Sequence, residues 1–573
     1  MKRILYICLF SIIISPAYSQ VTIIQPDVVD VASMKVVNGK VIYGHEGMLQ
    51  WEYELWATDG TPAGTGLVKD INPNYAGDLF NWSTQSRTDG LLYENHVYND
   101  RLYFYADDGI HGMELWVSDA TNAGTNMLYE FNPGLMGWDF TDYKVPDFCE
   151  MNNLLYMNAG NLANGNELWV TDGTTGGTQE VIDLNPGSVS SNPSFLTLYH
   201  GKLYFTATDG IHGWELYCSD GTQAGTQLVS DMIPGMRGIF DDGTGSSSIH
   251  PHFTVAGGLL YFQGDDAGGI GAQQRHWWRT DGTAAGTFRI ETTLFPYDEE
   301  DAAVEMNGVF YFQSYDGGFG GELWKSDGTV NGTTQVTMNN GLLIRPAMMS
   351  LGNYIYFNGA DNDSTGLAYS DGTTAGTGWS FSVQEVIPFM VKTPAIYNDN
   401  IFFGMGWYLD GGWDLTTRLV QTNGTQNGTV IYPIAQPRSK VFPLGNDFIF
   451  YGSDTIVRIN DPFDTFMFRL TPAVLPGGAG VGVSETKKNK TISCYPNPAS
   501  DKFSIQSNDF DLRDAMVSIV DVTGKLVYST KLEGDNYSSV NISIPATLSN
   551  GFYLIEIRNS NQVISEQLVI NRN

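Results

Sequence analysis

The chain of 573 residues is longer than one ordinary domain, and it combines few charges (16%) with 65 glycines and 13% aromatic residues. This composition favours short strands joined by tight turns and excludes a predominantly helical protein. The formal net charge of −33 argues against nucleic acid and anionic membrane surfaces as partners, and we interpret it mainly as keeping an exported protein soluble.

The first 19 residues have the pattern of a secretory signal peptide. Lys2 and Arg3 precede an apolar run over residues 4–14, and small residues lead to a cleavage site between Ser19 and Gln20. The apolar run is short for a membrane span, and no later segment has the hydropathy of one. We therefore expect residues 1–19 to be removed on export.

A twelve-residue motif then recurs eight times. From Asp59 to Asn423 the copies span 364 residues in seven intervals, a mean period of 52. Such a period indicates a repeat architecture. The copies are ELWATDGTPAGT (54–65), ELWVSDATNAGT (114–125), ELWVTDGTTGGT (167–178), ELYCSDGTQAGT (215–226), HWWRTDGTAAGT (276–287), ELWKSDGTVNGT (322–333), GLAYSDGTTAGT (366–377) and RLVQTNGTQNGT (418–429).

Each copy follows a short aromatic strand and precedes a β-rich stretch, so one unit is about four strands. In the DGT turn we expect Gly60 to take a positive φ and Asp59 to accept backbone N–H groups two residues on. The Trp or Tyr three residues before the Asp is expected in the core between units, as at Trp56. The Glu of the motif, as at Glu114, is expected to bond to the backbone at the unit edge.

Four-stranded units in eight copies predict an all-β fold, a β-propeller of about eight blades over residues 20–475. An aromatic stretch at 445–459 without a DGT turn is expected to complete the first blade by pairing with the N-terminal strands near residues 21–43, closing the ring. Two stacked smaller propellers and an open solenoid are the alternatives.

The repeat region, roughly residues 40–460, resembles the ELWxxDGT repeat family of bacterial secreted proteins. The last two copies depart from the motif, with Ala368 and Val420 in place of Trp and Asn423 in place of Asp. The resemblance implies a propeller-like fold and a secreted protein, and it implies no particular activity.

Residues 476–490 read as a Gly-rich and Lys-rich linker, and residues 491–573 as a small β-sandwich of immunoglobulin type. This last segment resembles the type A sorting domain of the type IX secretion system; the alternative is an ordinary immunoglobulin-like module. The resemblance implies passage through the outer membrane, a cell-surface or extracellular location, and the secretion machinery as a partner. The matching residues are Tyr495, Pro496, Asn497, Pro498, Asp521, Gly524, Lys525, Gly551, Phe552 and Tyr553, with the final apolar strand 567–570.

No cofactor is expected, and calcium is the one metal that the sequence raises. Asp361 and Asp363 lie in the nearest approach to a calcium loop, but no Glu follows at the twelfth position. These residues and the acidic pairs at 107–108 and 265–266 are interpreted first as turns. His111 and His212 fall in equivalent DGIHG loops and are also interpreted as turn residues. The cysteines left after cleavage are expected as free thiols: Cys149, Cys218 and Cys494.

The sequence contains no recognisable catalytic motif. Its arginines, at 101, 237, 275, 279 and 345, show no spacing that marks an active-site cluster. We therefore expect a non-enzymatic binding or adhesion protein that contacts a glycan or a surface protein. The alternatives are a polysaccharide hydrolase or lyase with acids at the ring centre, and a passive surface component. The loops to inspect are 74–98, 134–150 and 236–250, with the aromatic residues Trp82, Trp138, Phe140 and Phe240.

Overall fold

The computed structural model describes most of the repeat region and parts of the C-terminal segment. The chain divides into two compact units, residues 1–481 and 482–573. In the described residues all regular structure is β, apart from one short 3₁₀ turn at Thr175–Gly177, so the all-β prediction is confirmed. The described residues are 21–25, 31–46, 53–73, 95–133, 147–235, 237–241, 249–266, 275–291, 295–296, 302–315, 321–337, 342–360, 364–384, 390–397, 399–408, 415–424, 428–432, 436–437, 441–445, 447–453, 465–470, 492–495, 500–507, 512, 515–520, 526–532, 539–546, 548, 551–558 and 563–570.

The first unit contains nine antiparallel sheets in its described residues, and eight of them carry one copy of the motif each. We number these sheets as blades 1 to 8 in chain order. Blade 1 is β2 (Val31–Val37), β3 (Lys40–Glu46), β4 (Tyr53–Thr58) and β5 (Gly66–Lys69); blade 2 is β6 (His96–Tyr98), β7 (Arg101–Asp107), β8 (Met113–Ser118) and β9 (Asn126–Tyr129); blade 3 is β10 (Phe148–Met151), β11 (Leu154–Asn161), β12 (Gly165–Thr171) and β13 (Gln179–Ile182); blade 4 is β14 (Ser194–Tyr199), β15 (Lys202–Thr208), β16 (Trp214–Ser219) and β17 (Gln227–Ser230).

The next four blades keep the same strand order, with one extra short strand in blade 6. Blade 5 is β18 (Thr254–Ala256), β19 (Leu259–Asp265), β20 (Arg275–Thr280) and β21 (Phe288–Arg289); blade 6 is β22 (Phe295–Pro296), β23 (Ala303–Met306), β24 (Val309–Tyr315), β25 (Glu322–Ser326) and β26 (Thr334–Gln335); blade 7 is β27 (Leu343–Leu351), β28 (Tyr354–Ala360), β29 (Ser364–Ser370) and β30 (Thr377–Gln384); blade 8 is β31 (Met390–Tyr397), β32 (Asn400–Tyr408), β33 (Leu415–Thr422) and β34 (Thr429–Tyr432).

A ninth sheet joins the two ends of the repeat region, which differs from the eight blades expected. Its strands are β35 (Gln436–Pro437), β36 (Phe442–Leu444), β37 (Asp447–Ser453), β38 (Thr465–Leu470) and β1 (Val21–Gln25). The aromatic strand β37 does not extend blade 1; it pairs with β38, and β38 pairs with the N-terminal strand β1. The two ends of the repeat region therefore meet in a sheet of their own.

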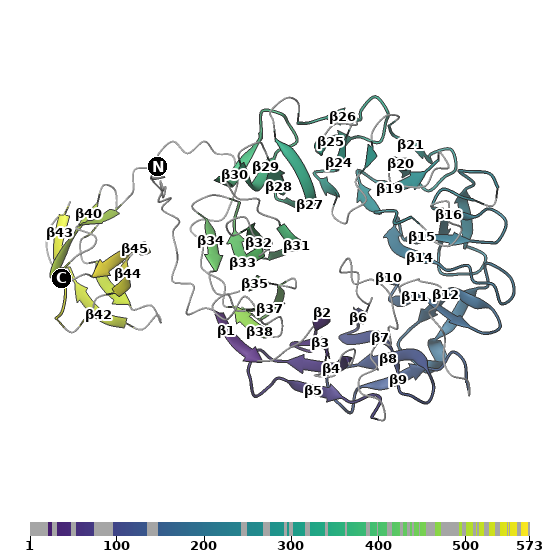
Figure 1. Ribbon diagram of the computed structural model, residues 1–573, viewed down its shortest axis with the longest axis horizontal. Helices are drawn as coiled ribbons and strands as arrows, with labels where there is room; N and C mark the ends of the chain where they lie inside the picture. The colour runs from purple at the N-terminus through teal and green to yellow at the C-terminus, as the bar shows by residue number, and fades with distance from the viewer. Residues whose placement is uncertain are drawn as a thin grey trace, which may run out of the picture. The chain divides into compact units, whose positions relative to one another are not determined.

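Nine hydrophobic clusters link the nine sheets, one between each pair of neighbours. Ile42 of blade 1 packs with Leu102 of blade 2, for example, and Ile449 of the ninth sheet packs with Val41 and Tyr43 of blade 1. The clusters between the other neighbours follow in chain order. The sheets of this unit thus close into a ring, as their arrangement around a common centre shows (Figure 1).

The aromatic second strands are buried on both faces because each blade is packed between two others. In β7 and β15 five consecutive residues are buried, although alternate side chains of a strand point to opposite faces. This double burial explains the continuous apolar runs such as LYFYA. The motif aromatic residues Trp116, Trp169 and Tyr217 are buried between blades, as predicted.

Each DGT turn is held by a short hydrogen-bond network. Asp59 Oδ1 accepts from Thr61 N at 2.9 Å and from Thr61 Oγ1 at 2.7 Å, and the hydroxyl groups of Thr58 and Thr65 lie 2.6 Å apart. Gly60 has φ +86°, so the expected turn geometry is confirmed. The second glycine is also required, because a Cβ at Gly64 would lie 2.1 Å from the Asp59 carboxyl carbon.

The first glycine of the turn contacts a tyrosine from the preceding blade. A Cβ at Gly221 of blade 4 would lie 2.1 Å from the hydroxyl oxygen of Tyr156 in β11 of blade 3, and a Cβ at Gly372 of blade 7 would lie 2.1 Å from that of Tyr311 in blade 6. The same contact recurs at three further blade pairs. An added Cβ would lie 2.6 Å from the Tyr103 hydroxyl oxygen at Gly173, 2.5 Å from that of Tyr204 at Gly282, and 3.1 Å from that of Tyr261 at Gly328, where Leu259 Cδ1 is nearer at 2.3 Å.

One blade pair lacks both partners of this contact at once. At the tyrosine position blade 1 has Ile42, and at the glycine position blade 2 has Ala120, with φ +65°. Both side chains lie in the cluster between the two blades. The alanine methyl group is therefore accommodated where no tyrosine hydroxyl approaches.

In the second unit two sheets share one hydrophobic core. Phe503 and Ile505 pack with Val517 and Ile519 from the other sheet. This arrangement fits a small β-sandwich, and its immunoglobulin topology stays a prediction. The sheets are β39 (Ile492–Tyr495), β40 (Lys502–Ser507) and β43 (Ser539–Ser543), and β42 (Leu526–Lys531), β41 (Met516–Val520), β44 (Gly551–Arg558) and β45 (Val563–Ile570).

The contact between blades predicts a large penalty for Gly221→Ala. Its Cβ would overlap the Tyr156 hydroxyl at φ +92°, so we expect a loss of about 2 kcal/mol in the free energy of unfolding, measured by urea denaturation. Adding Tyr156→Phe should restore part of that loss. Gly201→Ala is the control for backbone strain alone, because Gly201 has φ +72° with no atom within 4 Å of the added Cβ, and it should cost about 1 kcal/mol. Equal losses for the two glycine variants would contradict the contact.

Candidate binding face

The strand order gives the ring two different faces. The first strands of neighbouring blades contact one another, as β2 does with β6 and β10 with β14, so they lie innermost. Because all pairing is antiparallel, the DGT turns and the turns between first and second strands share one face, which we call the DGT face. The loops between second and third strands, with the connections between blades, form the opposite face, which we call the connection face.

Three loops of the connection face expose aliphatic side chains to solvent. They are residues 108–112, 161–165 and 209–213 of blades 2, 3 and 4, and we call them the blade 2–4 loops. Ile110 is 69% exposed, Leu162 65% and Ile211 68%. In equivalent positions Asp108 Oδ1 and Asp209 Oδ1 each accept two backbone N–H groups at 2.9 Å.

Neighbouring blades brace these loops from outside. Asn132, at the end of blade 2, accepts the Leu162 N–H of blade 3 on its Oδ1 at 2.9 Å. Asn72 and Asn185 lie close against Gly109 and Gly210 of the following blade, where an added Cβ would approach their amide groups to 2.7 and 2.8 Å. The loops are therefore fixed both by their own turns and by the blade before them.

The two loop histidines pair with aspartates of their own loops. His111 Nδ1 lies 2.7 Å from Asp108 Oδ2, and His212 Nδ1 lies 2.7 Å from Asp209 Oδ2. The hydrogen bond to the aspartate raises the pKa of each histidine, chiefly because it favours the charged imidazolium. In the described residues no three His, Cys, Asp or Glu side chains gather where they would hold a metal ion.

The motif glutamates are buried beneath the connection face and bond to the backbone. Glu114 Oε2 accepts the Phe131 N–H at 2.6 Å, and Glu215 Oε1 accepts the Ile233 N–H at 3.0 Å. Glu167 accepts Leu184 N–H at 2.9 Å and Ser191 N–H at 2.8 Å. Each glutamate thus ties a third strand to the connection that leads to the next blade. Burial raises the pKa of Glu114 and of Glu167 to about 7, and that of Glu215 to about 8.

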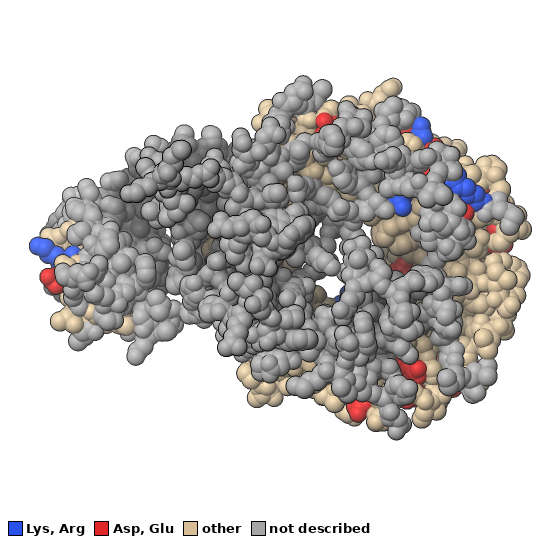
Figure 2. Space-filling model, in the orientation of Figure 1, with Lys and Arg blue, Asp and Glu red and all other residues tan. Residues whose placement is uncertain are grey.

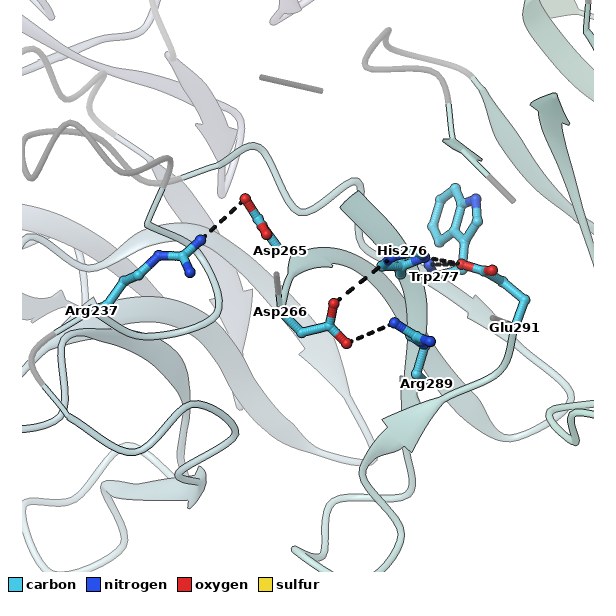
Figure 3. Close-up of polar contacts among 7 residues, drawn as sticks. All are labelled: Arg237, Asp265, Asp266, His276, Trp277, Arg289 and Glu291. Atoms are coloured by element: carbon cyan, nitrogen blue, oxygen red, sulfur yellow. Dashed lines mark hydrogen bonds and ion pairs between the residues drawn. The ribbon is translucent and has the colours of Figure 1, made fainter. Parts of the chain in front are cut away.

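Blade 5 replaces this glutamate with a histidine and builds a different network (Figure 3). His276 occupies the glutamate position in β20, and Glu291, after β21, supplies the carboxylate. Glu291 Oε1 accepts the Trp277 N–H at 3.1 Å and lies 2.9 Å from His276 Nδ1. The third strand and the following connection are therefore still joined by a hydrogen bond to a carboxylate, but in blade 5 the carboxylate comes from the connection and not from the strand.

Two ion pairs extend the blade 5 network (Figure 3). Asp266 Oδ2 lies 2.8 Å from Arg289 Nη1, and the buried Asp265 lies 3.1 Å from Arg237. Arg237 comes from the connection between blades 4 and 5, and its carbonyl accepts the Trp214 N–H of blade 4 at 3.2 Å. Both aspartates of this acidic pair are therefore neutralised by arginines where two blades join.

The structure changes the interpretation of several sequence candidates. Phe240, an aromatic residue of the loop 236–250 chosen for inspection, is fully buried between blades 4 and 5. Cys149 and Cys218 are free thiols, as predicted. Arg279 lies over the Phe288 ring at 4.0 Å. The exposed aliphatic residues were missed, although an isolated Ile between Gly and His in DGIHG is a visible signal.

Other candidates lie outside what the structure describes. The described residues do not include the calcium candidates Asp361 and Asp363, the cleavage site at 19–20, or the loop aromatic residues Trp82, Trp138 and Phe140. Of the sorting-signal residues, the backbones of Tyr495, Gly551, Phe552 and Tyr553 lie in strands β39 and β44, whereas Pro496, Asn497, Pro498, Asp521, Gly524 and Lys525 fall outside the described residues.

Comparison with protein families identifies the C-terminal unit. Residues 493–571 match the family described as the secretion system C-terminal sorting domain. The predicted sorting domain is thereby confirmed, and it indicates a secreted protein that interacts with the type IX secretion machinery and reaches the cell surface or the exterior. In the described residues no helix is long and apolar enough to cross a membrane. No curated protein matches the chain.

Solved structures give low similarity to the chain. The chain is similar to a prolyl endopeptidase at 9% identity and TM-score 0.35, over 78% of this chain and 57% of that one. It is similar to a Mycobacterium tuberculosis puromycin-hydrolyzing peptidase at 10% identity and TM-score 0.33, over 71% and 60%. An α-L-arabinofuranosidase from Clostridium thermocellum has 13% identity and TM-score 0.22, over 38% and 88%.

The buried glutamates predict a ring that loses stability as pH rises. Their pKa in the folded state is about 7 to 8, above the ordinary 4.5, so the folded chain keeps protons that the unfolded chain releases. Their contribution is therefore full below about pH 4.5 and is lost as pH rises through 7 to 8. Glu215→Gln should flatten the fall in unfolding free energy between pH 5 and 8 by on the order of 2 kcal/mol.

The control is Asp100→Asn, because Asp100 is an exposed carboxylate in the turn that precedes β7. It should leave the pH profile of unfolding as in the wild type. If the wild-type stability were constant from pH 5 to 8, and Glu215→Gln had the same profile, the buried glutamates would not carry the proton linkage.

Proposed function

We propose that the ring is a non-enzymatic, extracellular binding protein that holds a protein partner on its connection face. The observation that carries this proposal is the exposure of Ile110, Leu162 and Ile211 in loops that are braced on consecutive blades. Single exposed aliphatic residues are common on protein surfaces. Three of them, presented by neighbouring loops whose conformation is fixed, are typical of a contact surface.

The chemistry of these side chains favours a protein over a glycan. Sugar rings stack on exposed aromatic faces, whereas the large apolar side chains exposed in the described residues are aliphatic or methionine. The fixed loops also favour binding energetically, since a loop whose backbone is already ordered before association loses little backbone entropy when the complex forms. An exported chain with a sorting domain would meet such a partner at the cell surface or outside the cell.

The test is binding of the full mature chain, by biolayer interferometry, to a panel of purified extracellular and bacterial surface proteins and to a glycan array. We expect a protein ligand whose affinity falls at least about tenfold in the triple variant Ile110→Ser, Leu162→Ser, Ile211→Ser, because each side chain contributes about 1 kcal/mol of apolar burial. Val330→Ser is the control, since Val330 is 51% exposed in a DGT turn on the opposite face.

Retention of affinity in the triple variant would place the binding site elsewhere. Selective glycan binding that survives the triple substitution would contradict a protein partner and support the sugar-binding alternative.

A further inference from the structure

The blade 2–4 loops lie side by side with the residues that follow the fourth strands of the same blades. We call the loops and these residues together the row. An acidic residue follows the fourth strand of each of these blades: Glu130, Asp183 and Asp231. The negative charges of Glu130 and Asp231 favour the charged imidazolium of His111 and His212 respectively, and so add to the rise in the pKa of each histidine. In blades 2 and 4 an acidic residue therefore acts on the loop of the same blade.

Lysine and arginine are separated from this row, and the histidines within it, His111 and His212, are paired with Asp108 and Asp209. Across the described residues of blades 2 to 4 (95–133 and 147–235) the basic residues are Arg101 and Lys202, and both follow the turns between first and second strands on the DGT face. Arg237, just beyond blade 4, is paired with the buried Asp265. Figure 2 shows acidic side chains near β8 and β9, whereas Lys and Arg gather near β20 and β21. The row is thus apolar at its loop tips and acidic between them.

We propose that this row binds an extended polypeptide segment of a partner protein in which Lys or Arg residues are interspersed with aliphatic ones. The inference rests on the proposed function and specifies the class of partner. Aliphatic side chains of the segment pack on Ile110, Leu162 and Ile211, and its basic side chains approach Glu130 and Asp231. An anionic lipid surface or a nucleic acid would meet the same carboxylates unfavourably.

The experiment uses the full mature chain and three fluorescent peptides, each of four identical repeats. The repeats are Lys-Ile-Ser-Gly, Glu-Ile-Ser-Gly and Lys-Ser-Ser-Gly, and affinity is measured by fluorescence anisotropy at low and at physiological salt. The Lys-Ile peptide should bind at least about tenfold more tightly than either other peptide, because it alone satisfies both the apolar and the acidic groups. Its affinity should fall with added salt.

Two sets of variants separate the two contributions. The triple serine variant at positions 110, 162 and 211 should reduce the affinity for the Lys-Ile peptide to that for the Lys-Ser peptide. The pair Glu130→Gln and Asp231→Asn should weaken binding about tenfold and reduce its salt dependence. Asp100→Asn is the matched control, because Asp100 is an exposed aspartate of a turn on the DGT face, and it should change nothing.

Equal binding of the three peptides, or an equal effect of Asp100→Asn and the acidic pair, would overturn the inference. If the Lys-Ile peptide does not bind while the triple serine variant still weakens the protein ligand from the panel, the proposed function stands and this choice of partner is wrong. If the triple serine variant affects neither the peptide nor the protein ligand, both proposals fail.

Discussion

The contact between a DGT turn and the tyrosine of the preceding blade is the constraint on which the ring depends. Closing a ring of sheets requires each blade to meet its neighbour at a reproducible spacing, since errors at each interface would accumulate. The Asp59-type carboxylate closes the turn, the second glycine leaves room for it, and the first glycine receives a tyrosine hydroxyl at five interfaces. Where the tyrosine is Ile42, the turn has Ala120, and packing between the blades is kept by a different pair. The motif thus sets the spacing between neighbouring blades.

Because the DGT motif sets the spacing of the blades, the sequence of the connection face can vary. Glutamates such as Glu167 and the asparagines 72, 132 and 185 tie the connection face to the same interfaces, so its loops inherit the rigidity of the ring. Because the loops are rigid, they do not fold over Ile110 and Ile211, and both side chains stay exposed to solvent. In blade 5 the position of the motif glutamate is occupied by a histidine, and an ion-pair network there joins two blades. One position of the repeat can therefore change locally while the fold is kept.

The sequence predicts local chemistry better than long-range pairing. The turn at Asp59 and Gly60 and the backbone bonds of the motif glutamates follow from residue type and spacing, and the structure confirms them. The ninth sheet was not foreseen, because β38 carries no DGT turn and its partner β1 lies at the other end of the repeat region. Phe240 was a candidate binding residue of the loop 236–250, since no pattern shows that this connection folds back between two blades. The binding face depends on exposure, which a single sequence does not display.

The most direct measurement of the central claim, that contacts between blades hold the connection face rigid, is hydrogen–deuterium exchange on the full chain without partner. The Leu162 amide of blade 3 donates to Asn132 of blade 2, so it should exchange orders of magnitude more slowly than its intrinsic rate although the Leu162 side chain is exposed. The amides of Ile110 and Ile211, which donate to aspartates of their own loops, should be slowed as well. Exchange at the rates of an unstructured loop would contradict the account, because the aliphatic side chains would then belong to flexible segments with no fixed surface to offer.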